Sequence, residues 1–375
     1  LQKPAFLLFY HARAAEASIG EWLGVLWHGL SLDCTVAGYV TAFPVLVVLA
    51  SFWIPLSQRV WRIVLTVYFS LIALVTAAIF AVDLNLYGYW GFRLDGSVLI
   101  YLSDPGEALA SASWGEVLRQ ILIMLVYAGA MIWSYRWILR LFRVEPVPLR
   151  GRVVPTVAAL LIGGLTFLAI RGGVTVATAN VSKVYFSSNM FLNHAATNPV
   201  FSFLSSVGDN ENYAEAYPFF EEERRKTLFE ELRGNRPGAD AGTPRLLRSD
   251  RPNVVLILLE SFGRTIMDET VNGEPVMPNM QRFKREGVWF ENFFANSFRT
   301  DRGQVAVLCG FPAQTTMSIM KLPRKSATLP SLARSLGREG YRSVFMYGGD
   351  LNFTNQASFM YSTGWEELIW QKDMQ

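Results

Sequence analysis

The sequence predicts a multi-span α-helical membrane domain followed by an α/β domain. Of its 375 residues, 51% are hydrophobic and 17% are charged, which is unusual for a purely soluble protein. Long apolar runs are confined to residues 1–171, whereas residues 250–375 alternate short apolar runs with amphipathic segments. We therefore expect a transmembrane domain over 1–171, connecting helices and a linker over 172–249, and an α/β domain over 250–375.

Four apolar runs are long enough, or nearly so, to cross a bilayer, which takes about 20 apolar residues. They are Cys34–Ile54, Ile63–Val82, Val117–Leu139 and Val153–Ile170. The third is the weakest, because Arg119 and Arg136 bracket its centre and must extend toward the interfaces. The stretch "AFLLFY" at Ala5–Tyr10 is typical of the last part of an apolar helix, so the sequence predicts about five spans, the first incomplete.

The basic residues predict the orientation of these spans. Arginines concentrate in the loops at 55–62 and 136–152, whereas the alternate loops carry mainly acids. These acids are Glu16, Glu21 and Asp33 in one loop and Asp83, Asp95, Asp104, Glu107 and Glu116 in the other. The arginine-rich loops belong on the cytoplasmic side, which places everything after Arg171 outside the cytoplasm. The net charge of +3 is small and no basic patch stands apart from the apolar runs, so we expect no nucleic-acid partner.

The region between the two domains has a mixed, polar composition. "EEERRKTLFEEL" at Glu221–Leu232 carries opposite charges at helical spacing and predicts a solvated helix. "RGNRPGADAGTPR" at Arg233–Arg245 is rich in Gly and Pro and is typical of a linker.

Strand and helix patterns alternate in the last part of the chain. "NVVLILLE" at Asn253–Glu260 predicts a buried parallel strand that ends in an acid, and "GYRSVFMYGGD" at Gly340–Asp350 repeats the pattern. Between them, Met277–Gly287 and Leu329–Gly340 each predict an amphipathic helix closed by a glycine. This alternation favours a parallel sheet.

Two residues of this domain are candidates for chemistry. Glu260 is an acid at the end of an apolar strand, costly to bury unless it is paired or bound to a cation; a capping or salt-bridged carboxylate is the alternative. Thr300 is predicted to cap a helix that begins near Asp301, where the helix dipole and free N–H groups favour a phosphate or sulfate. Arg299 and Arg302 would add cationic donors. An ordinary threonine cap explains Thr300 equally well.

Other nucleophiles nearby have weaker support. Cys309 falls on an apolar helix face, which favours a buried small hydrophobe, and Ser297 has no activating neighbour that its position identifies. The other cysteine, Cys34, lies in an apolar run, so the sequence holds neither a disulfide framework nor a CxxC metal knuckle.

Five motifs in this order resemble one family. "NVVLILLESFGRT", "MPNMQRF", "FRTDRGQVAVLCGFPAQ", "LPSLARSLGREGY" and "MYGGDLNF" are similar to the lipoteichoic acid synthase and sulfatase-like branch of the alkaline phosphatase superfamily. The resemblance covers about Arg251–Gln375, and the membrane anchor before it matches the family architecture. It implies an alkaline-phosphatase-like fold and a multi-pass enzyme of the bacterial inner membrane, with its catalytic domain outside the cytoplasm.

The resemblance also implies roles for single residues. Glu260 matches a metal ligand, and Thr300 matches a metal-bound nucleophile that attacks a phosphodiester headgroup, as in phosphoglycerol transferases. Asp350 and Phe353 match the segment that lines the headgroup pocket. The implied cofactor is one divalent metal, Mn²⁺ by analogy with the synthases and Zn²⁺ or Mg²⁺ otherwise. The implied partners are an anionic lipid such as phosphatidylglycerol as donor and an envelope glycan or glycolipid as acceptor.

Two departures from the family patterns are visible. In "CGFPAQ", Pro312 comes one place too late after Cys309 for a formylglycine sulfatase, and no arginine follows. The family also completes its metal site with downstream histidines, whereas His11, His28 and His194 all precede this domain and are interpreted as surface or interface residues. We therefore expect the domain to be truncated on its C-terminal side and the chain as it stands to be inactive.

Three alternative functions remain open at the level of sequence. A sulfatase or a phosphoethanolamine transferase would belong to the same superfamily and differ in the headgroup pocket. A non-catalytic, lipid-binding regulatory relative would belong to another class and would have lost the metal ligands. The presence of both Glu260 and Thr300 argues against the last alternative.

Overall fold

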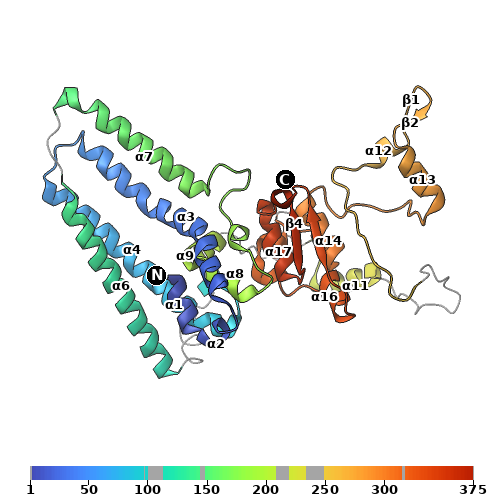
Figure 1. Ribbon diagram of the computed structural model, residues 1–375, viewed down its shortest axis with the longest axis horizontal. Helices are drawn as coiled ribbons and strands as arrows, with labels where there is room; N and C mark the ends of the chain where they lie inside the picture. The colour runs from blue at the N-terminus through green and yellow to red at the C-terminus, as the bar shows by residue number, and fades with distance from the viewer. Residues whose placement is uncertain are drawn as a thin grey trace. The chain divides into compact units, whose positions relative to one another are not determined.

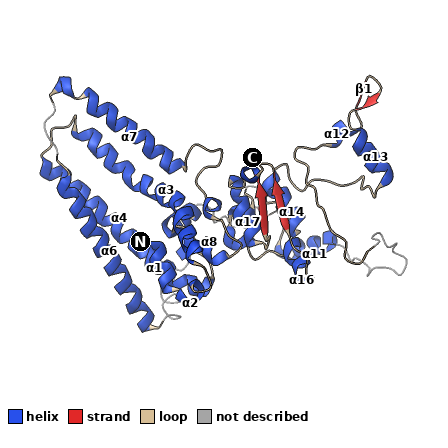
Figure 2. Ribbon diagram, in the orientation of Figure 1, coloured by secondary structure: helices blue, strands red, loops and turns tan. Residues whose placement is uncertain are grey.

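The computed structural model describes residues 2–96, 98–99, 113–143, 148–207, 219–233, 249–314 and 317–374 (Figure 1). These residues form two compact units, one made of residues 1–210 with 301–375 and the other of residues 211–300. Helices dominate both units, and strands are few and short (Figure 2). Apart from Arg233, the linker expected at Arg233–Arg245 lies outside the described residues.

Four helices of the first unit are long and apolar enough to cross a membrane, counted over the described residues. They are α3 (Ile19–Ser51), α4 (Gln58–Trp90), α6 (Trp114–Leu141) and the segment Leu149–Arg171, which contains α7 (Val153–Arg171). They contain the four apolar runs that the sequence predicts as spans, apart from the last residues of the first run. The stretch at Ala5–Tyr10 falls largely in the short helix α1 (Gln2–Phe9), which α2 (His11–Ala14) follows.

Capping residues make these helices longer than the apolar runs alone predict. Ser18 and Glu21 form a capping box at the start of α3, and Ser113 forms the same box at the start of α6. At the other end, Gly91 closes α4 in the left-handed conformation, with φ of 70°. The expectation that the acids between the predicted spans lie in loops is therefore wrong for four of them, because Glu21, Asp33, Asp83 and Glu116 lie inside helices.

The long helices pack in pairs, α3 against α7 and α4 against α6 (Figure 1). In the first pair, the Cα of Gly38 lies so close to Ile170 that an added Cβ would be 3.0 Å from its side chain, and Thr35 Oγ1 donates to the carbonyl of Ala169 at 3.0 Å. Small residues of this kind let two helix backbones approach closely. The remaining apolar faces are exposed, as expected where lipid would cover them.

A layer of short elements follows the spans: η3 (Val181–Val184), α8 (Met190–Ala196) and α9 (Pro199–Ser206). All seven residues of α8 except Met190 are buried, and α8 packs on α3. His194, interpreted from the sequence as a surface or interface residue, is not at the surface, because it is buried in this helix. The hydroxyl of Tyr87 contacts His194 Nδ1 at 3.1 Å and gives the ring a polar partner inside the core.

The rest of the first unit begins in α14 (Thr300–Cys309) and contains a two-stranded sheet. Strand β3 (Val344–Tyr347) pairs in parallel with β4 (Glu367–Trp370), with Val344 opposite Glu367 (Figure 2). The parallel strand predicted at Gly340–Asp350 is confirmed; β4 has no counterpart in the prediction. The intervening elements are η4 (Ile319–Lys321), α15 (Pro323–Ser326), α16 (Leu332–Arg338), η5 (Phe353–Asn355) and α17 (Gln356–Ser362), with η6 (Gln371–Asp373) after β4.

The second unit contains α11 (Glu222–Arg233), α12 (Arg264–Met267), α13 (Pro278–Glu286) and a small hairpin. The hairpin joins β1 (Thr270–Val271) to β2 (Glu274–Pro275) through Asn272 and Gly273, whose φ values of 55° and 85° suit a type I′ turn. Helices α11 and α13 confirm the helices predicted from charge spacing and amphipathic pattern.

The prediction of a strand at Asn253–Glu260 is wrong, because this segment forms no strand in the structure. The segment has no ladder partner among the described strands, and Val255 and Ile257 are 83% and 70% exposed. A parallel strand takes its backbone hydrogen bonds from a neighbouring strand, so an apolar run without such a neighbour does not form one. The local sequence therefore specifies an extended, apolar segment but not its pairing.

Candidate active site

The structure brings Glu260 and Thr300 together within the second unit. Thr300 Oγ1 lies 2.6 Å from Glu260 Oε1 and 2.7 Å from Oε2, although the two residues are 40 positions apart in the chain. The hydroxyl has one proton to donate, so the two carboxylate oxygens share it. A hydroxyl at this distance can donate its proton to the carboxylate, which is one requirement of a nucleophile with an adjacent base.

The backbone beside Glu260 adopts an uncommon conformation. Ser261, the next residue, has φ of 54°, in the left-handed region that a residue with a side chain rarely occupies. Such a conformation costs roughly 1 kcal/mol or more and tends to occur at functional sites. It turns the chain sharply where the extended apolar segment ends, and Glu260 stands at this turn.

Thr300 stands at a helix start, close to where the sequence places it. It is the first residue of α14, one position inside the predicted cap. The preceding turn is closed by Ser297, whose Oγ accepts the backbone N–H of Arg299 at 3.4 Å. Thr300 therefore sits at the positive end of a ten-residue helix, where the helix dipole favours an anion.

The two arginines predicted as anion donors differ in exposure. Arg299 is exposed, whereas Arg302 is only 6% exposed inside α14. Burial leaves little of the Arg302 side chain open to a ligand in solution. Both roles stay predictions.

Asp350 and Phe353, predicted to line a headgroup pocket, lie in the first unit. Asp350 Oδ1 accepts the backbone and the side-chain N–H of Asn352, both at 2.9 Å, and thereby holds a tight turn. Phe353 follows at the start of η5 and is 46% exposed. Thr354 and Asn355 then have φ of 54° and 64°, so this loop, like the one beside Glu260, has unusual backbone conformations.

Lys183 interacts with this loop and was not predicted from the sequence. Burial lowers its pKa, and the negative charge of Asp350 partly offsets that effect. The 3₁₀ helix that carries Lys183 also contacts the loop directly: Asn180 Nδ2 donates to the carbonyl of Asn352 at 2.8 Å. The spacing of these residues along the chain does not predict the contact.

Cys309 is a structural residue, as predicted. It is 7% exposed and packs with Val305, Met320 and Phe359 in the core around α14 and α17. Burial raises the pKa of its thiol to about 11, so the reactive thiolate is scarce near neutral pH.

The donor set for a divalent metal is present only in part. Three oxygens converge at the site, Thr300 Oγ1 and the two of Glu260, and hard oxygen donors suit Mn²⁺ or Mg²⁺. The described ranges contain no group of three or more His, Cys, Asp or Glu side chains placed to hold a metal ion. Glu260 and Thr300 therefore fit one side of a metal site.

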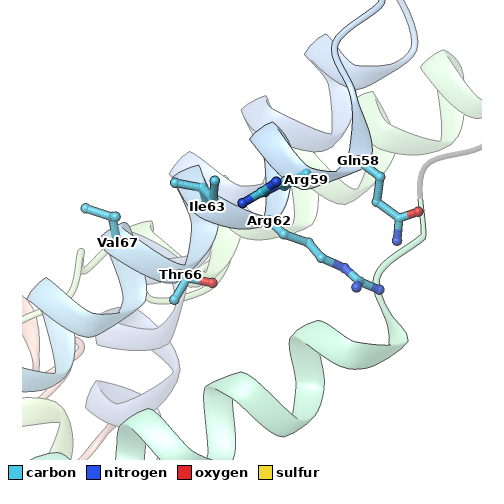
Figure 3. A pocket seen from close by; sticks show the side chains of 6 residues that line it. All are labelled: Gln58, Arg59, Arg62, Ile63, Thr66 and Val67. Carbon is cyan, nitrogen blue, oxygen red and sulfur yellow. The ribbon is translucent and has the colours of Figure 1, made fainter.

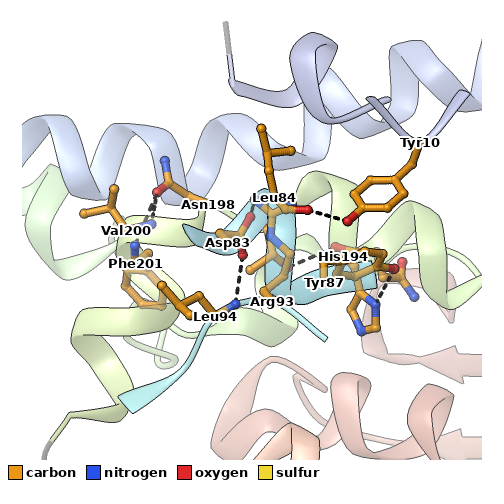
Figure 4. A network of polar contacts seen from close by, with 12 residues as sticks. Tyr10, Asp83, Leu84, Tyr87, Arg93, Leu94, His194, Asn198, Val200 and Phe201 are labelled. Atoms are coloured by element: carbon orange, nitrogen blue, oxygen red, sulfur yellow. Dashed lines mark hydrogen bonds and ion pairs between the residues drawn. The ribbon is translucent and has the colours of Figure 1, made fainter. Parts of the chain in front are cut away.

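A second acid, Asp83, lies in a buried polar network near the end of α4 (Figure 4). Its Oδ2 is 3.0 Å from Arg93, and its Oδ1 accepts the backbone N–H of Leu94 at 2.8 Å. Tyr10 donates to the carbonyl of Leu84, and Tyr87 reaches His194. Asp83 is a charged residue within an apolar helix, and this was the one sequence feature that could have predicted the network.

Comparison with known families agrees with the fold class, a membrane domain followed by an α/β domain. Residues 252–375 match the family model described as Sulfatase, so this part of the chain is similar to sulfatase domains. It follows four apolar helices of membrane-spanning length. The fold class predicted from the sequence, an α-helical membrane domain followed by a sulfatase-like α/β domain, is confirmed.

Individual relatives narrow the comparison. Phosphoglycerol transferase I of Xanthomonas campestris pv. campestris (strain B100) is 36% identical over 124 residues, covering 31% of this chain and 17% of the relative. Lipoteichoic acid synthase 1 of Bacillus subtilis (strain 168) is 31% identical over 130 residues, covering 31% of this chain and 19% of the relative. The chain thus spans less than a fifth of the length of these curated relatives. No solved structure gives a significant match.

Proposed function

We propose that the protein is a membrane-anchored transferase or hydrolase that cleaves phosphodiester headgroups, of the phosphoglycerol-transferase type, with Thr300 as nucleophile. The observation that carries the proposal is the contact between Thr300 Oγ1 and both oxygens of Glu260, at 2.6 and 2.7 Å, at the start of a helix. The names of the two relatives support the same class of reaction.

The chemistry follows from the position of the hydroxyl. Thr300 Oγ1 attacks the phosphorus of a phosphodiester, an O–P bond forms, and the bond from phosphorus to the lipid alcohol breaks. The carboxylate of Glu260 takes up the threonine proton, and this proton passes on to the departing alkoxide. An acceptor hydroxyl, or water, then displaces Thr300 and regenerates it. The N–H groups at the start of α14 favour the negative charge on the phosphoryl oxygens.

We include one divalent metal ion in the proposal, Mn²⁺ by analogy with the synthases and Zn²⁺ or Mg²⁺ as alternatives. Glu260 and Thr300 would hold it. When bound, it would lower the pKa of the hydroxyl and neutralise charge on the transferring group.

The proposed donor is an anionic lipid such as phosphatidylglycerol, and the proposed acceptor is an envelope glycan or glycolipid. Asp350, Phe353, Arg299 and Arg302 are the proposed headgroup-binding residues. We propose that the reaction takes place at the outer face of a bacterial inner membrane. The arginine-rich loops favour the cytoplasmic side, and the domain follows the last span on the other side.

A specific observation bears on the sulfatase alternative. Cys309 is buried in the core and lacks the formylglycine pattern, so a sulfatase built on that residue is disfavoured. A phosphoethanolamine transferase would use the same threonine chemistry and differ only in the group bound near it. A purely lipid-binding relative would have no use for a hydroxyl held against a carboxylate.

The proposal is tested in the full-length protein reconstituted in membranes. Thr300→Ala is expected to lower turnover of a phosphatidylglycerol analogue by about 10³-fold or more, because the attacking atom is gone. Bound metal, measured on the same samples, is expected to remain largely intact. Labelled donor should leave a covalent adduct on the wild-type peptide that contains Thr300, and none on the variant.

Two matched variants make the test specific. Ser297→Ala removes a neighbouring hydroxyl and should leave turnover within about twofold, as should Cys309→Ser. Undiminished activity in Thr300→Ala would refute the nucleophile assignment. A large loss of turnover in Cys309→Ser without unfolding would instead support the sulfatase hypothesis.

A further inference from the structure

A pocket of about 420 Å³ lies at the start of α4, far along the chain from the residues of the proposed reaction (Figure 3). It is lined by Gln58, Arg59, Arg62, Ile63, Thr66 and Val67. The side chains of Gln58 and Arg62 both reach the carbonyl of Phe142 at the end of α6, at 3.2 and 3.1 Å. All six lining residues belong to α4, and two of them bridge to the end of the antiparallel helix α6.

The lining residues form two adjacent ridges of α4. Residues 58, 62 and 66 follow one another at intervals of four, as do 59, 63 and 67, so each set lies along one side of the helix. From residue 58 to 67 the helix rises about 13 Å. Along 59, 63 and 67 the lining changes from the cationic Arg59 to the apolar Ile63 and Val67, whereas the ridge of 58, 62 and 66 is polar throughout.

The charge of this pocket is not balanced by the chain around it. Two arginines line it and no acid does. Arg62 donates to the carbonyls of Arg140 and Phe142, which are neutral acceptors, and Arg59 forms no ion pair within the described ranges. Two positive charges thus face the same space without a carboxylate.

The surroundings of the pocket limit what can occupy it. Only 6% of the most apolar stretch of α6 is buried inside the protein, so the sides of this helix are open to the bilayer. The loops at this end of the helices, 55–62 and 136–152, are the arginine-rich ones. By the positive-inside rule, this end of the helices lies at the cytoplasmic leaflet. Basic pockets between membrane helices on that side suit anionic lipid headgroups.

We propose that this pocket binds one anionic phospholipid of the cytoplasmic leaflet. Its phosphate lies between Arg59 and Arg62, and an acyl chain runs along Ile63 and Val67 toward the bilayer centre. The ridge of Arg59, Ile63 and Val67 runs from cationic to apolar, which matches the order of headgroup and chain in a phospholipid, and two unbalanced arginines match its charge. The site is independent of the chemistry at Thr300 and does not rest on the proposed function.

The test uses the full-length protein in phosphatidylcholine vesicles that contain a phosphatidylglycerol with a photoreactive acyl chain. After irradiation, peptide mass spectrometry should locate the label on the segment that contains Ile63 and Val67. The double variant R59Q/R62Q should reduce this labelling about tenfold or more, because each arginine that lies against the bound phosphate contributes roughly fivefold. R59Q alone should reduce it about fivefold.

Two comparisons keep the outcome decisive. R150Q/R152Q removes the same charge from the same end of the helices without touching the pocket, and its labelling should equal that of the wild type. Because Arg62 also bonds the end of α6, R59Q serves as the variant that leaves those bonds intact. Equal labelling in R59Q, R59Q/R62Q and R150Q/R152Q would overturn the proposal, as would equally strong labelling by a photoreactive phosphatidylcholine.

Discussion

Asp83 and Glu260 occupy similar places in the sequence but different places in the structure. Each carboxylate stands at or near the end of an apolar run. Asp83 is fully buried and paired with Arg93 at 3.0 Å, whereas Glu260 is exposed and contacts the hydroxyl of Thr300. The pattern of an acid after an apolar run therefore marks a residue that needs a partner, and the partner decides its role.

The physical difference between the two regions is desolvation. Burying a charge is costly, and the ion pair with Arg93 and the bond from Leu94 compensate Asp83 for its lost hydration. Glu260 keeps its hydration and remains open to a ligand. Asp83 is thus tied to the stability of the membrane-proximal core, and Glu260 is free to serve chemistry. The following predictions sharpen this contrast.

The largest effect is expected from Asp83→Ala. The substitution leaves Arg93 buried without its carboxylate, which should lower the free energy of unfolding by about 3–5 kcal/mol. Thermal unfolding of the detergent-solubilised protein measures the loss. Glu222→Ala, which removes the exposed pair with Lys226 at 2.7 Å, is the control and should change stability by about 0.5 kcal/mol or less. Equal melting of the two variants would contradict a structural role for Asp83.

A smaller effect is expected when the pH falls. Burial first, and the charges of Arg93 and Arg13 next, lower the pKa of His194 to about 3, from 6.5. Below pH 6.5 the unfolded chain binds a proton that the folded chain refuses, so the stability present above that pH is lost as the pH falls toward 3. At pH 5 the loss from this residue is about 2 kcal/mol.

Melting temperatures of wild type and His194→Gln across this range test the assignment. Glutamine keeps an acceptor for Tyr87 but cannot take up a proton. The variant should therefore show a flatter dependence on pH between 6.5 and 5. The same slope in both proteins would mean that His194 is not the responsible group.

The smallest effect on stability is expected at the proposed active site. Glu260→Gln and Thr300→Ala each alter an exposed contact, so the free energy of unfolding should change by about 0.5 kcal/mol or less. Glu260→Gln should nevertheless weaken metal binding, because a neutral amide replaces a charged ligand. Metal content at equal folding, measured by elemental analysis, separates the two effects. A loss of fold in either variant would place this pair with Asp83 among the structural residues.

Much of the fold could be predicted because it depends on local patterns. The apolar runs that became α3, α4, α6 and α7, and the charge spacing that became α11, need only neighbouring residues to form a helix. The start of α14 at Thr300 likewise follows from local sequence. Helix ends were less well predicted, because capping boxes at Ser18 and Ser113 extend helices beyond their apolar cores.

Strand pairing could not be predicted in the same way. Val344–Tyr347 forms its parallel ladder because β4 is present beside it. The equally apolar segment at 253–259 has no such neighbour among the described strands and stays exposed. Because strand bonds join residues far apart in the chain, the sequence of one strand does not determine its partner.

The sequence by itself determined the membrane helices, the sulfatase-like domain and the candidate residues Glu260 and Thr300, because these follow from composition, periodicity and motif order. Only the tertiary structure decided that Glu260 meets Thr300, that Asp83 meets Arg93, that His194 is buried, and that Arg59 and Arg62 share one pocket. These are contacts between side chains that the chain brings together only on folding, and no spacing along the sequence encodes them.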